Sequence, residues 1–254
     1  MKKINLSTKE SHKFGCLICG EELHYGEEET LHCMLCGKDT RSNVSCPKGH
    51  FVCDACHGKK ALVSLMEEVY KNTFTDPIKV AQSMMDKEGV HMHGPEHHSL
   101  VALALLVAYK NAGGEVDFDE AAKEILRRGS KVPGGVCGNW GSCGASISVG
   151  IFFSVLSGAT PLTTDSWALS NRAAALAHLK IAELGGPRCC KRNTFTALLE
   201  ASKVIEEAYG VKLYPVLPVC TYFPMNRQCL LEGCPYYPKT QKLKQAPTLF
   251  KLKD

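Results

Sequence analysis

Hydrophobic positions recur with a helical period over most of this chain, and start and stop signals bracket the periodic segments. An aspartate or proline opens several segments, and glycines close them. We predict helices over residues 60–72, 77–87, 95–113, 117–128, 144–156 and 165–184, and from Asn193 onward. Beyond the first 60 residues, only 211–219 has a pattern that suits an extended strand, and prolines interrupt it. The sequence therefore predicts a mainly α protein.

Two of these segments, residues 100–108 and 144–156, are apolar on every face. Such a pattern is typical of central buried helices. Neither segment reaches the roughly 20 residues that a membrane-spanning helix needs. With a formal net charge of only +4, the chain is expected to be a soluble globular protein without a membrane partner.

The first 60 residues are different, because they contain seven of the 14 cysteines. The three CxxC pairs, together with Cys46 and His50, supply eight ligands, which is enough for two tetrahedral zinc ions. The predicted ligands are Cys16, Cys19, Cys33, Cys36, Cys46, His50, Cys53 and Cys56. Two wirings fit the spacing: a sequential one, as in zinc ribbons, and a cross-braced one in which alternate pairs share an ion.

Three domains follow from these patterns: a small zinc module at residues 1–60, an all-helical cysteine-rich domain at 61–238, and a basic tail at 239–254. The chain opens without the apolar run of a secretory signal, which favours zinc over disulfides and a cytoplasmic location. The module carries nine Lys or Arg against eight Asp or Glu, and this balance argues against phosphate binding. The histidines near the ligands, His24, His32 and His57, are interpreted as surface or supporting residues.

The other seven cysteines lie on three glycine-rich or basic loops. Glycines and helix N-termini favour negatively charged sulfur, and cationic neighbours lower a thiol pKa. An iron–sulfur cluster is the leading prediction for this set, with a third zinc or a catalytic dithiol as alternatives. The predicted cofactor ligands are Cys137, Cys143, Cys189, Cys229 and Cys234, with Cys190 as a spare reactive thiol. Cys220, between Val219 and Thr221, is the cysteine for which a buried structural role has most weight.

The segment HMHGPEHH, residues 91–98, places several nitrogen and oxygen donors at the start of a buried helix. His97 and His98 point about 100° apart on a helix, so they do not easily share one ion. His93 with His97 or Glu96 is the more plausible pair, and we predict that His93 and His97 act on substrate as an acid/base pair. Helix capping and local hydrogen bonding are the alternative.

The run PGGVCGNWGSCGASISVGIFFSVLSGATPL, with HGPEHH before it and GGPRCCKR and CLLEGCPYYP after it, resembles an uncharacterised domain family of anaerobic bacteria and archaea. Members of that family sometimes stand beside methyltransferase domains. The resemblance covers residues 75–238 and implies no mechanism. CGNWGSCGASISVG is also similar, more weakly, to helical redox-associated proteins with a CGCAxxG pattern.

The functional prediction is a metal- or iron–sulfur-dependent redox or sulfur-transfer enzyme that acts on a small molecule or a sulfur carrier. The alternative is a non-catalytic zinc scaffold or regulator that holds a protein or RNA partner. A third reading, a tRNA-sulfur enzyme, has less support because the chain lacks a nucleotide-binding P-loop.

Overall fold

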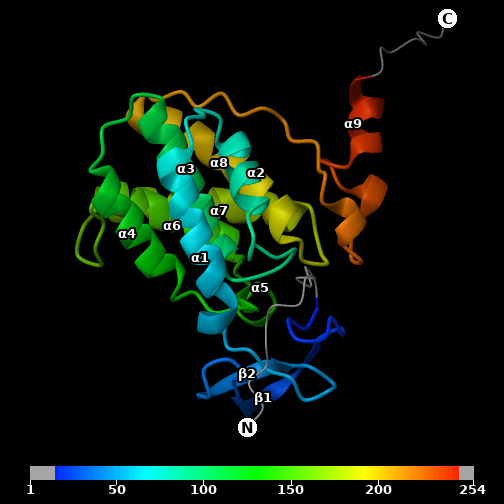
Figure 1. Cartoon of the computed structure of the whole chain (residues 1–254). Helices are drawn as coiled ribbons and strands as arrows, with labels where there is room; N and C mark the ends of the chain where they lie inside the picture. Colours follow the sequence, from blue (N-terminus) through cyan, green and yellow to red (C-terminus); the bar gives the residue numbers. More distant parts are fainter. Residues whose placement is uncertain (1–14, 246–254) are drawn as a thin grey trace, which may run out of the picture.

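The computed structural model describes residues 15–245, and the described part consists of a small metal module below a body of helices (Figure 1). The module contains an antiparallel hairpin of β1 (His24–His32) and β2 (Asp39–Ser45). Thr30 pairs with Arg41, and the register shifts between Tyr25 and Glu29. This hairpin was not among the predicted elements. The prediction of a mainly α fold behind an N-terminal cysteine-rich module is confirmed.

The helices follow one another with short connections. They are α1 (Asp54–Lys71), α2 (Pro77–Met85), α3 (His97–Asn111), α4 (Phe118–Gly129), α5 (Val136–Asn139), α6 (Gly144–Leu156), α7 (Asp165–Glu183) and α8 (Cys190–Tyr209). Two 3-10 turns, η1 (Phe223–Met225) and η2 (Leu231–Gly233), precede α9 (Pro238–Gln245). Residues 246–254 of the predicted basic tail lie outside the described residues, as do residues 1–14 of the predicted zinc module.

Local signals explain several helix boundaries. Asp76 and Asp117 cap α2 and α4, because their carboxylates accept hydrogen bonds from the backbone N–H groups of Ile78 and Glu120. The prediction that α8 begins at Asn193 was wrong. The helix begins at Cys190, because the Cys189 sulfur takes the capping position and accepts the N–H of Arg192 at 3.4 Å.

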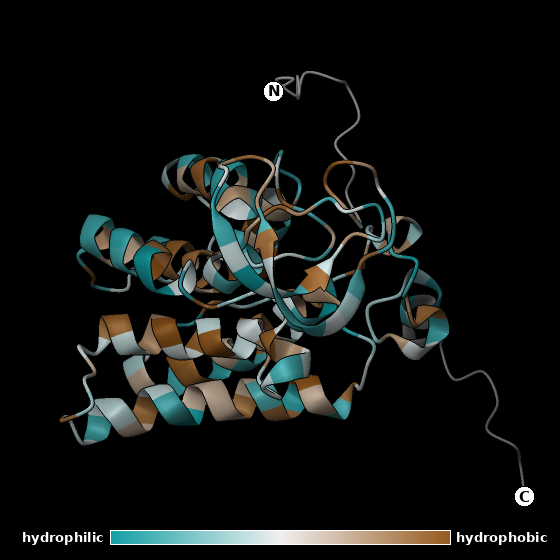
Figure 2. Ribbon diagram, turned by 90° about the horizontal axis from the view of Figure 1, so that it is seen from below, coloured by the Kyte–Doolittle hydropathy of each residue, from teal (hydrophilic) through white to brown (hydrophobic). Residues whose placement is uncertain are grey.

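The core of the helical body surrounds α3. Every residue of α3 from His97 to Tyr109 is buried, and the helix packs against α2, α4, α6 and α8. The backbone N–H of Ala102 donates to Ser148 of α6 at 2.9 Å. Phe152 and Phe153 of α6 are fully buried. The two segments that are apolar on every face therefore pack against each other in the core, as their patterns predicted. In the view from below, the helices of the body show many hydrophobic residues, whereas the strands of the hairpin are largely hydrophilic (Figure 2).

The segment after α8 runs across the helical body toward α9 as an irregular loop (orange in Figure 1). The strand considered for 211–219 does not form, because Tyr214 takes a positive φ of 47° and this stretch has no strand partner within the described residues. The loop carries Cys220, Cys229 and Cys234 back to the start of α8. It thereby positions three cysteines that are distant in sequence from the other loops.

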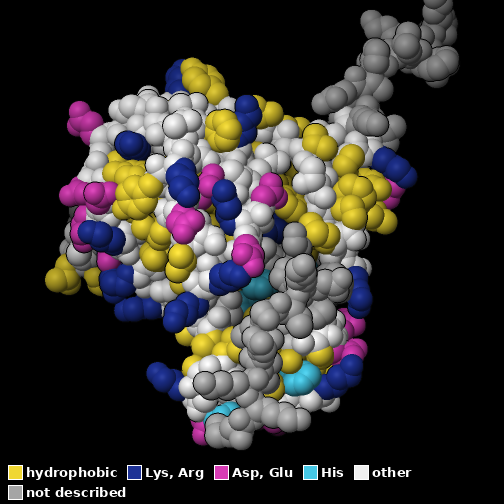
Figure 3. All heavy atoms as spheres, in the orientation of Figure 1, with side chains coloured by type: hydrophobic (Ala, Val, Ile, Leu, Met, Phe, Trp, Pro, Cys, Tyr) yellow, Lys and Arg dark blue, Asp and Glu magenta, His cyan; other side chains and the backbone are white. Residues whose placement is uncertain are grey.

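No helix within residues 15–245 combines the length and the apolarity that a membrane crossing requires. On the face shown in Figure 3, lysines and arginines are intermingled with aspartates and glutamates over the helical body. This distribution agrees with the formal net charge of +4.

Candidate metal centres and the adjoining cleft

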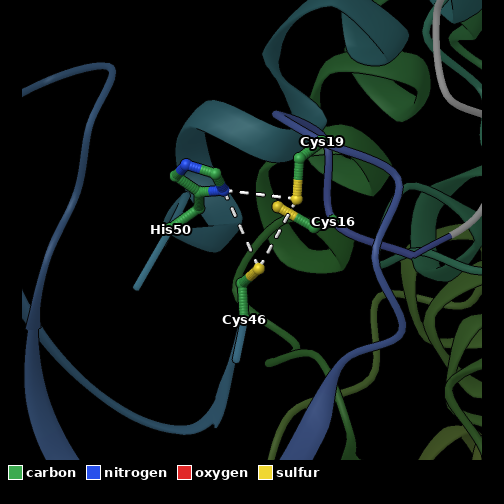
Figure 4. A group of neighbouring side chains, drawn as sticks. All are labelled: Cys16, Cys19, Cys46 and His50. Carbon is green, nitrogen blue, oxygen red and sulfur yellow. Dashed lines mark hydrogen bonds between the residues drawn. The ribbon is translucent and has the colours of Figure 1, made fainter. Parts of the chain in front are cut away.

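The first candidate metal centre joins the first and third ligand pairs of the module. Cys16, Cys19, Cys46 and His50 place their donor atoms within 4.8 Å of one another (Figure 4). The Cys19 sulfur lies 3.6 Å from that of Cys46 and 3.3 Å from Nδ1 of His50. Zinc–sulfur bonds of about 2.3 Å at tetrahedral angles separate two sulfurs by about 3.8 Å. The group therefore has the size and the donor chemistry of a structural zinc site.

The second candidate centre joins the second and fourth pairs, Cys33 and Cys36 with Cys53 and Cys56. The sulfurs of Cys36 and Cys53 are 3.8 Å apart, and the backbone N–H of Cys53 donates to the Cys33 sulfur at 3.4 Å. Such N–H···S bonds stabilise thiolates before a metal arrives. All four donors are thiols, so this group also fits zinc.

The wiring of the module is cross-braced. The strands of the β1–β2 hairpin start and end beside ligands, since β1 leads into Cys33 and β2 leads into Cys46. The second pair therefore lies at the turn of the hairpin. Strand β2 then leads the chain back, so that the third pair lies beside the first pair. The two groups could each hold one metal ion, so the eight predicted ligands fall into two candidate centres.

A cleft of about 1040 Å³ lies between the module and the helical body. Three contacts hold its two sides together. Asp54 Oδ2 accepts the backbone N–H of Gly134 at 2.7 Å, and Asn43 Nδ2 donates to Asn139 Oδ1 at 3.3 Å. Arg188 stacks on the ring of Tyr25 and donates to its hydroxyl group. The cleft therefore has one wall from each part of the chain.

Five of the site residues predicted outside the module line this cleft. They are His93, His97, Cys137, Cys143 and Cys190. The other three predicted cysteines, Cys189, Cys229 and Cys234, are not among its lining residues. The structure thus divides the second cysteine set into a cleft group and a group behind it.

Two cysteines of the cleft group lie at the N-termini of long helices. Cys143 is the N-cap of α6, and its sulfur accepts a hydrogen bond from Asn193 Nδ2 at 3.3 Å. Cys190 is the first residue of α8. Burial raises the pKa of Cys190 to about 12 and also raises that of Cys143, so both groups are thiols until a ligand or a cation alters their surroundings.

The cysteines behind the cleft are connected through Asn226. The side-chain N–H of Asn226 donates to the sulfur of Cys189 at 3.7 Å, and the backbone carbonyl of Asn226 accepts the backbone N–H of Cys229 at 3.0 Å. The backbone N–H of Cys220 donates to Tyr236, two residues after Cys234. Burial is the largest cause of the raised pKa of Cys189. The nearby Cys234 and Cys229 raise this pKa further, whereas Arg192 lowers it.

The histidines of the HMHGPEHH segment are largely buried. Burial lowers the pKa of His93 to about 4 and that of His97 to about 3, so both imidazoles are neutral near pH 7. His93 Nε2 lies 3.3 Å from Asn226 Oδ1, and His97 Nδ1 lies 3.2 Å from the carbonyl of Gly94. Hydrogen bonds to nearby groups therefore explain part of the way in which these two histidines are held. The rings of His93 and His97 nevertheless line the cleft.

A third group of donor atoms was missed by the sequence analysis. His57, His91 and Glu96 place one donor each within 4.8 Å of one another. His57 was interpreted as a surface or supporting residue, but its side chain is only 19% exposed and lies 3.8 Å from the Glu96 carboxylate. One signal in the sequence could have identified His57, namely its position directly after the candidate ligand Cys56. A metal ligand in the first turn of α1 would fix the direction of the next side chain on that helix.

No curated protein and no solved structure matches this chain. A family model described as a family of unknown function matches residues 65–237, which is more than half of the chain. The match covers most of the stretch, 75–238, whose motifs resembled an uncharacterised family. The likeness to the CGCAxxG proteins stays a prediction. The chain therefore belongs to the family of unknown function DUF5714.

Proposed function

We propose that this chain is a metal-dependent thiol enzyme of the reducing cytoplasm that carries out redox or sulfur-transfer chemistry in the cleft. The observation that carries the proposal is the meeting of Cys143, Cys190 and His97 in one cavity that the metal module closes. All 14 cysteines are free of disulfide bonds, which agrees with a reducing compartment.

Cys190 is the residue we propose as the sulfur carrier. It lies at the N-terminus of α8, where the helix dipole favours negatively charged sulfur. Arg188 lies two residues before it and lines the cleft, and Lys191 follows it directly in the chain. An anionic sulfur group bound in the cleft would meet the positive charge of Arg188.

The sulfur-transfer step is a thiol exchange. The Cys190 thiolate attacks the terminal sulfur of a persulfide, R–S–SH, and forms a new S–S bond while the donor's S–S bond breaks. The products are the Cys190 persulfide and the donor thiolate, R–S⁻. His93 and His97 also line the cleft, but their lowered pKa values make both weak bases toward a thiol whose pKa is raised to about 12. In this proposal the two neutral imidazoles hold the donor by hydrogen bonds, and the proton of the Cys190 thiol ends on the departing donor thiolate.

An iron–sulfur cluster is proposed for the cysteines behind the cleft. Cys189, Cys229 and Cys234 are ligands in this proposal, and Cys220 is the fourth in place of Cys137 and Cys143. The support is a repeated turn: the backbone N–H of Leu231 donates to Cys229, as those of Ile18 and Lys48 donate to Cys16 and Cys46 in the module. Backbone N–H groups also lower the pKa of Cys220 and Cys234 against the larger effect of burial.

The first experiment is to purify the full-length protein without oxygen and to measure zinc, iron and acid-labile sulfide per chain with the visible spectrum. We expect roughly four irons and a broad absorption from thiolate-bound iron. Cys220→Ser should lose the iron, whereas Cys137→Ser should keep it. Equal iron in the two variants would contradict this ligand set.

The second experiment tests the carrier. The protein is treated with a low-molecular-weight persulfide, and the added sulfur is located by mass spectrometry of peptides. The added sulfur should appear on Cys190 and disappear in Cys190→Ser. Cys137→Ser is the matched control, because Cys137 lines the same cleft but is neither the carrier nor a cluster ligand in this proposal. Unchanged labelling in Cys190→Ser would contradict the proposed role.

A non-catalytic scaffold is the second candidate, and one observation favours it. Two large apolar side chains that follow each other in the module, Met34 and Leu35, are exposed. Exposed apolar side chains close together are typical of protein-binding surfaces. If the protein contains zinc alone and takes up no sulfur, capture of a protein partner that depends on Met34 and Leu35 becomes the test of this function.

A further inference from the structure

We infer that His57, His91 and Glu96 form a third metal site, which binds a divalent transition-metal ion through two imidazoles and one carboxylate. The site lies at the junction of the module and the helical body. This inference stands apart from the proposed thiol chemistry, since none of its ligands is a cysteine.

The first support is a set of buried polar atoms that lack partners. Nδ1 of His57, Nδ1 of His91 and Oε2 of Glu96 have no hydrogen-bond partner among the described residues. Buried polar atoms are rarely left unsatisfied, and a missing ion is one of the accepted explanations. Here the three atoms belong to one group of donors within 4.8 Å of one another.

The second support is the way in which Glu96 is held. Its side chain is fully buried, and its Oε1 accepts the backbone N–H of His91 at 2.8 Å. This bond fixes the carboxylate and leaves Oε2 facing Nδ1 of His57. Any side chain at position 94 larger than that of glycine would overlap this carboxylate, so Gly94 permits the close approach.

The distances suit a metal better than direct hydrogen bonds. Nδ1 of His57 lies 3.8 Å from Glu96 Oε2, and Nδ1 of His91 lies 3.5 Å from Oε1. Both separations are beyond good hydrogen-bond length. Two ligands on one zinc ion, each at about 2.1 Å, are separated by about 3.4 Å at a tetrahedral angle.

The position of the site indicates its use. His57 and His91 both line the cleft, whereas Glu96 lies beneath them and is not among the lining residues. Three protein ligands on a tetrahedral ion leave one position for water or substrate, which distinguishes catalytic from structural zinc sites. Two histidines with one carboxylate also form the ligand set of ferrous enzymes with open positions.

Metal analysis with a conservative variant tests the inference. The full-length protein is dialysed against Co²⁺ or Zn²⁺, and bound metal per chain is compared with that of Glu96→Gln. We expect the variant to bind one equivalent fewer, with its affinity reduced at least tenfold, because even outer partners of metal ligands contribute about that much. In the cobalt protein, the lost absorption should lack thiolate charge-transfer bands, since the ligands are nitrogen and oxygen.

The thiolate bands of the two module sites serve as an internal measure of folding. His57→Ala should lose the same equivalent, whereas His24→Ala, an exposed histidine of the hairpin, should keep it. Cys190→Ser should also keep it, which separates this site from the proposed thiol chemistry. The inference is wrong if wild type and Glu96→Gln bind equal amounts of metal, or if the lost equivalent carries thiolate bands.

Discussion

The carboxylate of Asp54 accepts a 2.7 Å hydrogen bond from the backbone N–H of Gly134, 80 residues further along the chain. Asp54 is the first residue of α1 and directly follows the ligand Cys53. Gly134 lies in the turn before α5, the short helix that carries Cys137. The contact therefore ties the geometry of the second metal centre to the loop that forms the opposite wall of the cleft.

Replacing Asp54 by alanine should loosen this connection. We expect the free energy of unfolding to fall by about 1 kcal/mol, the typical net contribution of such a hydrogen bond. Hydrogen exchange should become faster at Gly134 and its neighbours. Asp39→Ala, which removes an exposed carboxylate that contacts His32 within the hairpin, is the control. Unchanged exchange at Gly134 would show that the contact does not hold the loop.

The cross-braced wiring predicts how double variants lose zinc. Cys19 and Cys46 belong to one centre, whereas Cys19 and Cys36 belong to different centres. Cys19→Ser with Cys46→Ser should therefore cost one zinc ion per chain, and Cys19→Ser with Cys36→Ser should cost two. Sequential wiring gives the reverse order, so zinc analysis of the two double variants decides between the arrangements.

The ion pair between Glu68 and Lys87 predicts a pH dependence of stability. The two charged groups are 2.6 Å apart, and the Glu68 side chain is only 10% exposed. Burial acts to raise the pKa of Glu68, but hydrogen bonds from Lys87, Ser83 and Asn72 outweigh it and keep this pKa below the usual 4.5. A carboxyl group with a lowered pKa stabilises the fold above its unfolded-state pKa and loses that contribution as the pH falls through the folded value.

Glu68→Gln should therefore lower the free energy of unfolding by about 1 kcal/mol near pH 7, since Lys87 is partly exposed and solvent screens the pair. The difference from wild type should shrink as the pH falls below 4.5. Glu67→Gln, on the same helix with a side chain 64% exposed, should have little effect. A difference that stays constant down to pH 3 would contradict the prediction.

The close approach of α6 to α3 predicts a strong effect at one glycine. A methyl group at Gly144 would overlap the ring of His98, whereas one at Gly138 would meet no atom within 4 Å. Gly144→Ala should cost about 1–3 kcal/mol of unfolding free energy, as overpacking in a core does, and Gly138→Ala should be nearly neutral. Chemical denaturation of both variants measures this. Equal stabilities would show that His98 moves aside without cost.

The sequence by itself determined most of the helices of this protein and the residues of the module that could hold metal. Helical periodicity and the capping residues Asp76 and Asp117 act within a few residues, so the segments they define can be read without knowing the fold. The same holds for the CxxC pairs, because a short turn brings both sulfurs to one ion. Cys189 shows the limit of local patterns. Its sulfur caps α8, but this role depends on the conformation of the preceding loop, which the local sequence did not reveal.

Only the tertiary structure decided which pairs share a metal ion, which cysteines line the cleft, and which histidines lie beside Glu96. The β1–β2 hairpin determines the pairing of ligands, and sequence spacing is the same for both wirings. His57 and His91 meet because α1 leaves the module beside the start of α3, a contact between residues far apart in the chain. Such long-range contacts depend on how the helices pack, and no local pattern encodes them.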